Sequence, residues 1–294
     1  MTAAPVVLLA TCAEVADLDA DSRALADALR ARGADVRPAV WDAEVDWAAA
    51  DLVVVRSTWD YVPRREEYLA WAARVAAVTR LENPPDLLRW STDKAYLEDL
   101  RAAGLPVVPS AVLAPGDGGD HPFLGVEHVV KPTVSAGSKD TLRLGADAEG
   151  ARRSADHVLA LHAEGRTALV QPYLAAVDDD GETAVVCADG EVVHAVRKGP
   201  LLERGGGRVE GLFAEENISA RTAAEAELEV ARAALDVVRG RTGRAPLYAR
   251  VDLLPSEDGP VLLELELAEP SLFLDVTPGA ADAVAAAVLR RVAG

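Results

Sequence analysis

Cysteine is nearly absent from this chain of 294 residues, which contains only Cys12 and Cys187. Two cysteines so far apart in sequence do not support a disulfide framework or a zinc site. Proteins without disulfides are typical of reducing compartments. The sequence therefore predicts a cytoplasmic protein.

Basic residues are also in short supply. The chain has 30 Lys and Arg against 48 Asp and Glu, a formal net charge of −18, and no run of basic residues is longer than two. Because a protein that grips nucleic-acid backbones needs clustered cations, the composition argues against a nucleic-acid partner. Small cationic ligands and metal-bound ligands remain compatible with this charge.

The apolar run that opens the chain is too short to cross a membrane. Residues 6–10 (VVLLA) fall far below the roughly 20 apolar residues of a spanning helix, and residues 1–5 lack the basic start of a signal peptide. We expect no membrane partner and interpret residues 6–10 as a buried parallel strand.

Strand-like and helix-like segments alternate over the first 110 residues. Extended segments are expected at 6–10, 35–40 and 51–56, and helices at 21–32 and 64–77. This alternation predicts parallel βαβ units, and residues 1–113 are expected to form an N-terminal α/β unit on the substrate side. A helix at 92–103 and a strand at 106–113 lead to a Gly- and Asp-rich linker at 115–120.

The segments after this linker alternate less regularly, and no internal repeat is visible. The expected strands lie at 127–131, 168–171, 182–188, 191–198, 248–254 and 261–267, and the expected helices at 148–164, 220–239 and 280–292. A Gly-rich stretch at 204–208 is expected to be flexible. We divide this part into a central unit, residues 114–172, and a C-terminal unit, residues 173–294.

Three carboxylates are expected to meet on one β-hairpin. A turn at 255–260 separates two apolar strands, and if it is centred near Asp258 it sets Asp252 opposite Glu264 and Arg250 opposite Glu266. Side chains alternate across a strand, so both glutamates share one face. Like charges in such proximity need a cation between them, and hard oxygen ligands suit Mg²⁺ shared with phosphates. The alternative is a solvated polar face.

A lysine and a loop of small residues lie together at residues 131–141. Lys131 ends an apolar strand, and the segment SAGSKDT at 135–141 offers backbone N–H groups. A lysine beside a loop with free N–H groups is suited to binding a polyphosphate. The chain has no G-x-x-x-x-G-K-[ST] motif, and no G-x-G-x-x-G follows the first strand. An ordinary mobile turn is the alternative.

Two further segments that follow predicted strands carry polar groups suited to ligand binding. Residues 171–174 (QPYL) offer an amide and backbone groups to an adenine edge, with an interdomain hinge as the alternative. The segment RSTWDY at 56–61 follows an apolar strand, at the carboxyl end where open parallel sheets bind ligands. Arg56 is a candidate for pairing a carboxylate and Asp60 for holding an amine. Alternatively, these residues anchor a loop.

The order of these elements resembles the ATP-grasp superfamily over roughly residues 92–275. The resemblance implies ATP and Mg²⁺ as cofactors, bound by positions that match the family as follows: Lys94, Lys131 and the loop residues Ser135, Ala136, Gly137 and Ser138 at the phosphates; Gln171, Tyr173 and Leu174 at adenine; Glu182, with Asp178 as the weaker candidate, at the ribose; Asp252, Glu264 and Glu266 at Mg²⁺; and Arg250 at the transferred phosphate. Arg197 or Lys198 is expected at the γ-phosphate, and alternation lets only one of them face it. Many members of the superfamily place Asn where this chain has Glu266.

Longer strings resemble one group within that superfamily. These are VVRSTWDY at 54–61, LRWSTDK at 88–94, HAVRKGP at 194–200 and LELAEPSLF at 265–273. They look like the group that includes the O-ureido-serine cyclo-ligase of cycloserine biosynthesis, and the match spans nearly the whole chain. The resemblance implies an ATP-grasp fold, mixed α/β, behind an N-terminal parallel α/β domain.

The same resemblance implies ATP-dependent activation of a carboxylate as an acyl phosphate, followed by attack of a nitrogen of the same amino-acid-like small molecule. The residues expected to face this substrate are Arg56, Ser57, Trp59, Asp60, Glu269 and Ser271. Closure of residues 135–141, and of 205–207, would exclude water. The alternatives are an intermolecular amino-acid or dipeptide ligase, a small-molecule kinase and a non-catalytic nucleotide-binding regulator. The oligomeric state is left open, a homodimer included.

Overall fold

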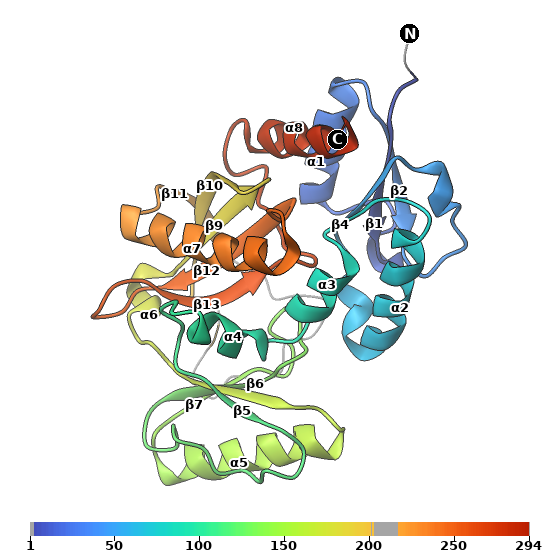
Figure 1. The fold of residues 1–294 in the computed structure, drawn as a ribbon. Helices are drawn as coiled ribbons and strands as arrows, with labels where there is room; N and C mark the ends of the chain where they lie inside the picture. The colour runs from blue at the N-terminus through green and yellow to red at the C-terminus, as the bar shows by residue number, and fades with distance from the viewer. Residues whose placement is uncertain (1–2, 201, 203–216, 294) are drawn as a thin grey trace.

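Three β-sheets make up the described part of the chain, which in this computed structural model comprises residues 3–200, 202 and 217–293. The three sheets are a parallel N-terminal sheet, a small antiparallel central sheet and a larger antiparallel sheet, and each is covered by its own helices (Figure 1). We call them the N-terminal, central and large sheets. The expected Gly-rich segment at 204–208 lies outside the described residues.

The N-terminal sheet has the strand order β2-β1-β3-β4, and all its pairs are parallel. Its strands are β1 (Val6–Thr11), β2 (Asp35–Val40), β3 (Leu52–Val55) and β4 (Leu81–Glu82), and its helices are α1 (Ala20–Ala31) and α2 (Arg65–Ala76), with short 3₁₀ helices at Ala13–Val15, Trp47–Ala49 and Trp59–Arg64. Val7 and Leu9 pack toward α1, whereas Leu8 and Ala10 pack toward the aromatic face of α2. Both faces of β1 are therefore buried, as its continuous apolar run predicted.

The connection that leads out of this unit differs from the expectation. The single helix expected at 92–103 is two helices, α3 (Pro85–Ser91) and α4 (Tyr96–Ala102). The Thr92 hydroxyl donates to Leu88 O at the end of α3, and Asp93 accepts from the Ala95 N–H at the start of α4. Polar side chains that bond to nearby backbone in this way interrupt a helix.

The central sheet has the order β5-β8-β6-β7. Its strands are β5 (Ala111–Leu113), β6 (His128–Pro132), β7 (Leu142–Leu144) and β8 (Ala168–Pro172), and α5 (Ala148–Ala163) covers one face. β7 was not expected, and only the end of the strand expected at 106–113 joins this sheet. Residues 106–108 instead bond to Leu262 of the large sheet.

The large sheet has the order β11-β10-β9-β12-β13. Its strands are β9 (Glu182–Ala188), β10 (Glu191–Lys198), β11 (Ile218–Arg221), β12 (Tyr248–Leu254) and β13 (Val261–Glu266); α6 (Val177–Asp180) precedes it and α7 (Glu225–Thr242) covers it. The helix expected at 220–239 thus begins later than predicted, because the preceding residues pair with β10 as an antiparallel strand.

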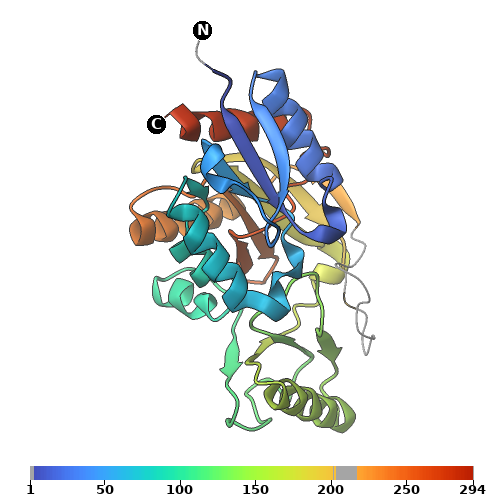
Figure 2. The same ribbon diagram turned by 90° about the vertical axis from the view of Figure 1, so that its right-hand side faces the viewer.

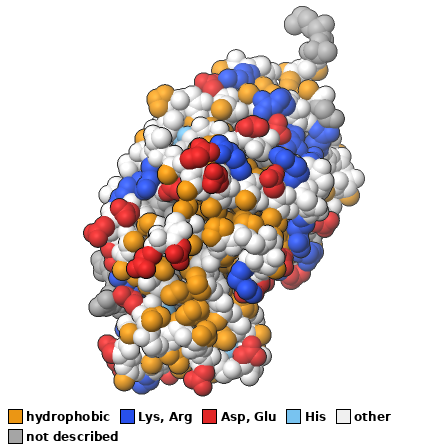
Figure 3. All heavy atoms as spheres, turned by 60° about the vertical axis from the view of Figure 1, so that its left-hand side comes forward, with side chains coloured by type: hydrophobic (Ala, Val, Ile, Leu, Met, Phe, Trp, Pro, Cys, Tyr) orange, Lys and Arg blue, Asp and Glu red, His pale blue; other side chains and the backbone are white. Residues whose placement is uncertain are grey.

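The last helix, α8 (Ala280–Ala293), returns to the N-terminal sheet and packs against α1. Figures 1 and 2 both place it at the same end of the molecule as the chain's N-terminus. No helix among the described residues combines the length and the apolar character needed to cross a membrane. On the face drawn in Figure 3, acidic and basic side chains are interspersed around a hydrophobic area.

Candidate active site

A cavity of about 470 Å³ lies where the three sheets meet. The N-terminal sheet contributes the connection before α1 and the 3₁₀ helix after β3, the central sheet contributes β6 and the phosphate-loop candidate, and the large sheet contributes β10, β12 and β13. In β12, Arg250 and Asp252 face the cavity, whereas Val251 and Leu253 pack in the core with α7. Strand alternation thus separates the polar site from the core.

The carboxylate hairpin has the register that the sequence predicted. Arg250 pairs with Glu266 and Asp252 pairs with Glu264 across β12 and β13, and a bulge follows Asp252. The Arg250 guanidinium bridges two acids, with Nε 2.8 Å from Asp252 Oδ1 and Nη2 2.5 Å from Glu266 Oε1. Lys198 Nζ lies 3.4 Å from Asp252 Oδ2. Against the effect of burial, Arg250 and Lys198 hold the pKa of Asp252 well below its usual range.

Two lysines converge on Glu264 from other elements. Lys94, between α3 and α4, places Nζ 2.9 Å from Glu264 Oε1 and donates to Ser135 O at 2.7 Å. Lys131 on β6 places Nζ 4.0 Å from Glu264 Oε2. Burial lowers the pKa of Lys131, whereas Glu264 outweighs burial at Lys94 and raises its pKa. The structure therefore brings both candidate phosphate lysines to the carboxylate hairpin.

The phosphate-loop candidate lines the same cavity. Ser135, Ala136, Gly137 and Ser138 all border it. Gly137 and Ser138 have φ values of +61° and +57°, and successive residues of this kind turn backbone N–H groups toward a common side. The far end of the loop is anchored by Asp140, whose Oδ2 accepts from Arg166 at 2.7 Å.

The adenine candidates lie at the opposite end from the N-terminal unit. Gln171 near the end of β8 and Tyr173 and Leu174 just after it line the cavity, and Gln171 Nε2 donates to Ser110 Oγ at 3.0 Å. Glu182, the ribose candidate, accepts from Lys198 Nζ at 2.7 Å. Burial, opposed by Lys198 and aided by Asp252, raises the pKa of Glu182 to about 7.

Arg143 on β7 contacts the residues at the adenine end of the cavity from outside the cavity. Its guanidinium lies 3.5 Å from the Tyr173 ring centroid. It donates to both carboxylate oxygens of Asp178, at 3.1 and 2.9 Å, to Glu127 Oε1 at 2.8 Å and to Leu202 O at 3.0 Å. Asp178 is therefore engaged by Arg143, and the Tyr173 hydroxyl donates to it as well.

Three of the residues expected at the substrate end line the cavity. These are Trp59, Glu269 and Ser271. The Trp59 indole Nε1–H donates to Glu269 O at 3.1 Å. Burial, reinforced by Glu266, raises the pKa of Glu269 to about 8. Burial thus favours the neutral form of the Glu269 carboxyl group, against the opposing effect of Lys94.

The structure does not bring four other predicted residues to the cavity. Arg56 is 2% exposed and binds Asp21 and Pro270 O, and Ser57 donates to Asp19. Asp60 accepts from the Trp41 indole at 2.7 Å and pairs with Arg64. Arg197 donates to the carbonyls of Asp179 and Asp180 at the end of α6, on the strand face opposite Lys198. These side chains hold backbone or other side chains instead.

Several cavity residues were missed from sequence, chiefly Asp19, Tyr61, Ser91 and Asp275. Asp19 caps α1 by accepting from the N–H groups of Asp21 and Ser22. Asp19 could have been predicted from its position after the first parallel strand, because loops at the carboxyl ends of parallel strands line ligand sites.

The carboxylate hairpin suits a hard cation by its donor chemistry. Asp252, Glu264 and Glu266 offer only oxygen ligands, as Mg²⁺ prefers. Among the described residues no three Asp, Glu, His or Cys side chains already form a metal cluster, because Arg250 and Lys94 lie against these carboxylates. Burial, opposed by Arg250 and reinforced by Glu264, raises the pKa of Glu266 to about 7. The donor set fits the ion because all three side chains are carboxylates that border one cavity.

Comparisons with known proteins agree with this geometry. Residues 7–83 match the family described as "D-cycloserine synthetase DcsG, N-terminal domain". The cycloserine biosynthesis protein DcsG of Streptomyces lavendulae is 40% identical to this chain over 301 residues, which is 98% of this chain and 99% of that protein. The chain belongs to the DcsG family. A crystal structure of D-cycloserine synthetase DcsG superposes with a TM-score of 0.88 at 36% identity, covering 98% of this chain and 99% of that one.

More distant solved structures share the fold. A RimK-domain ATP-grasp protein from Sphaerobacter thermophilus has a TM-score of 0.66 at 21% identity, covering 99% of this chain and 100% of that one. D-alanine–D-alanine ligase from Bacillus anthracis, solved with ATP, has a TM-score of 0.66 at 12% identity, covering 99% and 96%. The expected ATP-grasp fold and family resemblance are confirmed. As a DcsG family member, the chain is an ATP-dependent ligase that forms carbon–nitrogen bonds.

Proposed function

We propose that this ligase closes the ring of an O-ureido-serine-like amino acid, as a step of cycloserine biosynthesis. The proposal rests on full-length similarity to DcsG and above all on one structural observation. A single cavity is bordered both by the candidate phosphate groups and by Trp59, Glu269 and Ser271. A nucleotide and a small amino acid would meet inside it.

In the proposed site, the nucleotide lies along the central sheet. Gln171, Tyr173 and Leu174 contact adenine, and Glu182 accepts from the ribose hydroxyls. Lys94, Lys131 and the N–H groups of the 135–138 loop offset the phosphate charge. These groups border one cavity and come from separate elements, so binding would fix them relative to one another.

Asp252, Glu264 and Glu266 would hold Mg²⁺, which supplies positive charge at phosphate oxygens when bound. Arg250 and Lys198 already lie among these carboxylates, within reach of a phosphoryl group that enters the cavity. Of the two residues considered for the γ-phosphate, Lys198 borders the cavity and Arg197 does not. We therefore assign Lys198 and Arg250 to the transferring phosphate.

The proposed chemistry has two steps. A substrate carboxylate oxygen attacks the γ-phosphorus, the bond to the ADP oxygen breaks, and an acyl phosphate forms. A ureido nitrogen of the same molecule then attacks the acyl carbon, loses its proton and expels phosphate, which closes a five-membered ring. Preorganised cations stabilise the charge of the transferring group. Trp59, Glu269 and Ser271 would hold the amino acid in reach of the phosphate.

Hydroxylamine trapping and mass analysis test this proposal. With ATP, Mg²⁺ and O-ureido-serine, we expect ADP, phosphate and a ring closed through the nitrogen that is bonded to oxygen. The cyclic product is lighter than the substrate by one water while it keeps its carbamoyl group, and lighter by carbon dioxide plus ammonia once a water has hydrolysed that group. Added hydroxylamine should divert the acyl phosphate to a hydroxamate. A product joining two amino acids would establish the intermolecular alternative, and a stable phosphorylated substrate without hydroxamate would establish the kinase alternative. Absence of any nucleotide turnover with a panel of amino acids would favour a regulator.

Three other expectations stay predictions. The cytoplasmic location and the homodimer need fractionation and light scattering, respectively. The unit limits at residues 113 and 172 need limited proteolysis, and the central sheet already shows that β5 pairs with β8 across the first of them.

A further inference from the structure

The segment from Leu267 to Leu274, which we call the ledge, follows β13 without belonging to any sheet. Six consecutive carbonyl oxygens of the ledge each accept a hydrogen bond from a side chain. The donors, in order along the ledge, are Asn83 Nδ2 to Leu267 O at 2.7 Å, Tyr248 Oη to Ala268 O at 2.8 Å, Trp59 Nε1 to Glu269 O at 3.1 Å, Arg56 Nη2 to Pro270 O at 2.9 Å, Arg250 Nη1 to Ser271 O at 3.1 Å and His194 Nε2 to Leu272 O at 2.8 Å. Side chains replace the partner strand that such backbone would otherwise need.

Two N–H groups of the ledge are held by one carboxylate. Asp21 Oδ2 accepts from the Leu272 N–H at 2.7 Å, and Asp21 Oδ1 accepts from the Leu274 N–H at 2.6 Å. The same carboxylate pairs with Arg56 at 3.0 Å. Asp21 and Arg56 are 8% and 2% exposed, so this pair is largely buried, and of the two only Asp21 borders the cavity. Together the pair therefore binds the ledge through both its carbonyl side and its amide side.

The pair comes from the N-terminal unit, whereas the ledge extends from the large sheet. Asp21 lies in the first turn of α1, where a negative charge is favourable. Asp19 caps the helix, which leaves the Asp21 carboxylate to reach across to the ledge. Arg56 follows β3 directly. The pair consequently couples the position of the ledge to that of the N-terminal sheet.

Side chains of the ledge alternate between two environments. Glu269, Ser271 and Phe273 border the cavity, whereas Leu272 and Leu274 pack in the core that α1 shares with α8. A shift of the ledge by one residue would exchange these two sets. The contacts to Asp21 fix the register at Leu272 and Leu274, and so determine which side chains the substrate meets.

We propose that Asp21 and Arg56 are positioning residues that hold the ledge in register for the amino-acid substrate. This inference rests on the proposed function, in which the ledge side of the cavity receives the amino acid and the central sheet receives ATP. It gives Arg56 a different role from the carboxylate ligand expected from sequence. Arg56 acts through the backbone of Pro270 and through Asp21, without touching the substrate.

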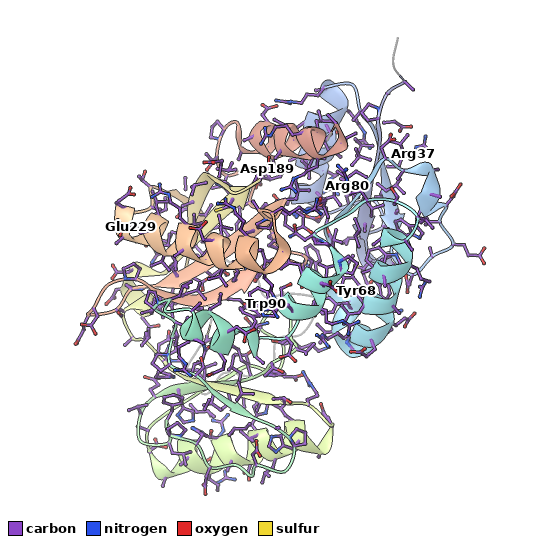
Figure 4. All side chains as sticks on the ribbon, viewed as in Figure 1. Arg37, Tyr68, Arg80, Trp90, Asp189 and Glu229 are labelled. Atoms are coloured by element: carbon purple, nitrogen blue, oxygen red, sulfur yellow. The ribbon has the colours of Figure 1, made fainter. Side chains whose placement is uncertain are left out.

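The test uses the full chain with Asp21→Asn and Arg56→Lys, two substitutions that keep side-chain size. The control pair is Asp35→Asn and Arg37→Lys. Asp35 and Arg37 also form an Asp–Arg ion pair, but it is solvent-exposed and lies on β2, at the outer edge of the molecule where Figure 4 labels Arg37. The first measurement is hydrogen exchange at the Leu272 and Leu274 amides. We expect at least about tenfold faster exchange in Asp21→Asn, because local opening sets the rate, and no change in the controls.

The second measurement separates the two ends of the cavity. In both ledge variants we expect the KM for the amino acid to rise about tenfold, as misplacement of substrate-positioning groups does, while the KM for ATP stays within about twofold. Because each variant disturbs the same joint contact of Asp21 and Arg56 with the ledge, the double variant should add little to either single one. KM is insensitive to the fraction of folded enzyme, so mere destabilisation does not mimic this pattern.

Unchanged exchange at Leu272 and Leu274 would overturn the inference, and so would equal increases in the two KM values. If the wild-type chain makes no cyclic product from O-ureido-serine, the proposed function fails, but the exchange measurement needs no substrate and still decides whether the pair holds the ledge. Should Asp21→Asn not fold, Arg56→Lys carries both measurements, since Lys retains the charge next to Asp21 but cannot offer a planar fork.

Discussion

Replacing Arg143 by Ala tests how the nucleotide end of the cavity is held. Arg143 itself does not border the cavity, but it contacts Tyr173, Asp178 and Leu202, and Tyr173 and Leu202 do border it. If the proposed ATP orientation is correct, loss of Arg143 should weaken ATP binding and leave amino-acid binding unchanged. The guanidinium is the link between β7 and the segment that would contact adenine.

The size of the effect follows from the contacts that are lost. The hydrogen bond to Glu127 joins two charged, mostly buried groups and contributes about 1.5–3 kcal/mol. The bond to Asp178, whose side chain is 41% exposed, contributes only about 0.5–1 kcal/mol, and the cation–π contact with Tyr173 adds roughly 0.5–2 kcal/mol. In the variant, the Tyr173 N–H still donates to Glu127 O, which keeps the Tyr173 backbone in place. Only part of the lost interaction energy therefore affects the position of the residues that would contact ATP. We estimate about 1.4 kcal/mol, which is a tenfold weaker affinity for ATP.

Calorimetric titration with a non-hydrolysable ATP analogue measures this change directly, and steady-state KM values for ATP and amino acid measure it during turnover. Arg152→Ala is the matched control, because Arg152 is an exposed arginine of α5 that pairs only with Glu149 and Asp156 on its own helix. An Arg143→Ala variant with a normal affinity for the analogue and a lowered unfolding free energy would refute the reasoning. Arg143 would then stabilise the fold alone.

Three further predictions concern the carboxylates and the ledge. Glu264→Gln should abolish ADP release while circular dichroism stays native, because the amide can neither hold Mg²⁺ nor neutralise Lys94; undiminished turnover would contradict the metal assignment. Glu269 has a folded-state pKa of about 8, above its ordinary 4.5, so its contribution to stability is complete below pH 4.5 and is lost as the pH rises through 8. Relative to Glu269→Gln, the wild-type unfolding free energy in urea should therefore fall between pH 5 and pH 9, and a constant difference would argue against this proton. Asn83→Ala removes three buried hydrogen bonds, to Leu247 N, Tyr248 O and Leu267 O, and should cost about 3–5 kcal/mol by urea unfolding; a loss below about 1 kcal/mol would show that water replaces the amide.

The carboxylate hairpin could be predicted from sequence because its geometry is local. Two apolar strands joined by a short Pro- and Gly-bounded turn have few possible registers, and side-chain alternation then fixes which residues share a face. The observed pairing of Asp252 with Glu264 follows from these two rules alone. Local reasoning also placed Lys131 at the end of an apolar strand, where it borders the cavity, whereas Glu182 was selected through the family resemblance and borders the cavity as well.

The substrate end could not be predicted in this way. Position after β3 correctly indicated the carboxyl edge of the sheet, but whether Arg56 faces the cavity depends on Asp21 and on Pro270, which is 214 residues away. A buried arginine binds whichever acceptors packing places beside it, and here one of them, Pro270 O, belongs to another unit of the chain. Asp19 was overlooked for a related reason, since its role as a helix cap fully accounts for an aspartate at that point in the sequence.

The charge of the cavity constrains how its ligands arrive. The described residues that border it include eight carboxyl side chains and only four basic ones, Lys94, Lys131, Lys198 and Arg250. Burial raises the pKa of Glu182 and Glu266 to about 7 and of Glu269 to about 8, which removes part of the negative charge near neutral pH but not all of it. A bare triphosphate would meet net repulsion in such a site. Because the four basic groups already neutralise neighbouring carboxylates, the additional charge must come with the ligands. In the proposed function, a divalent cation bound to ATP and an ammonium group on the amino acid would supply it.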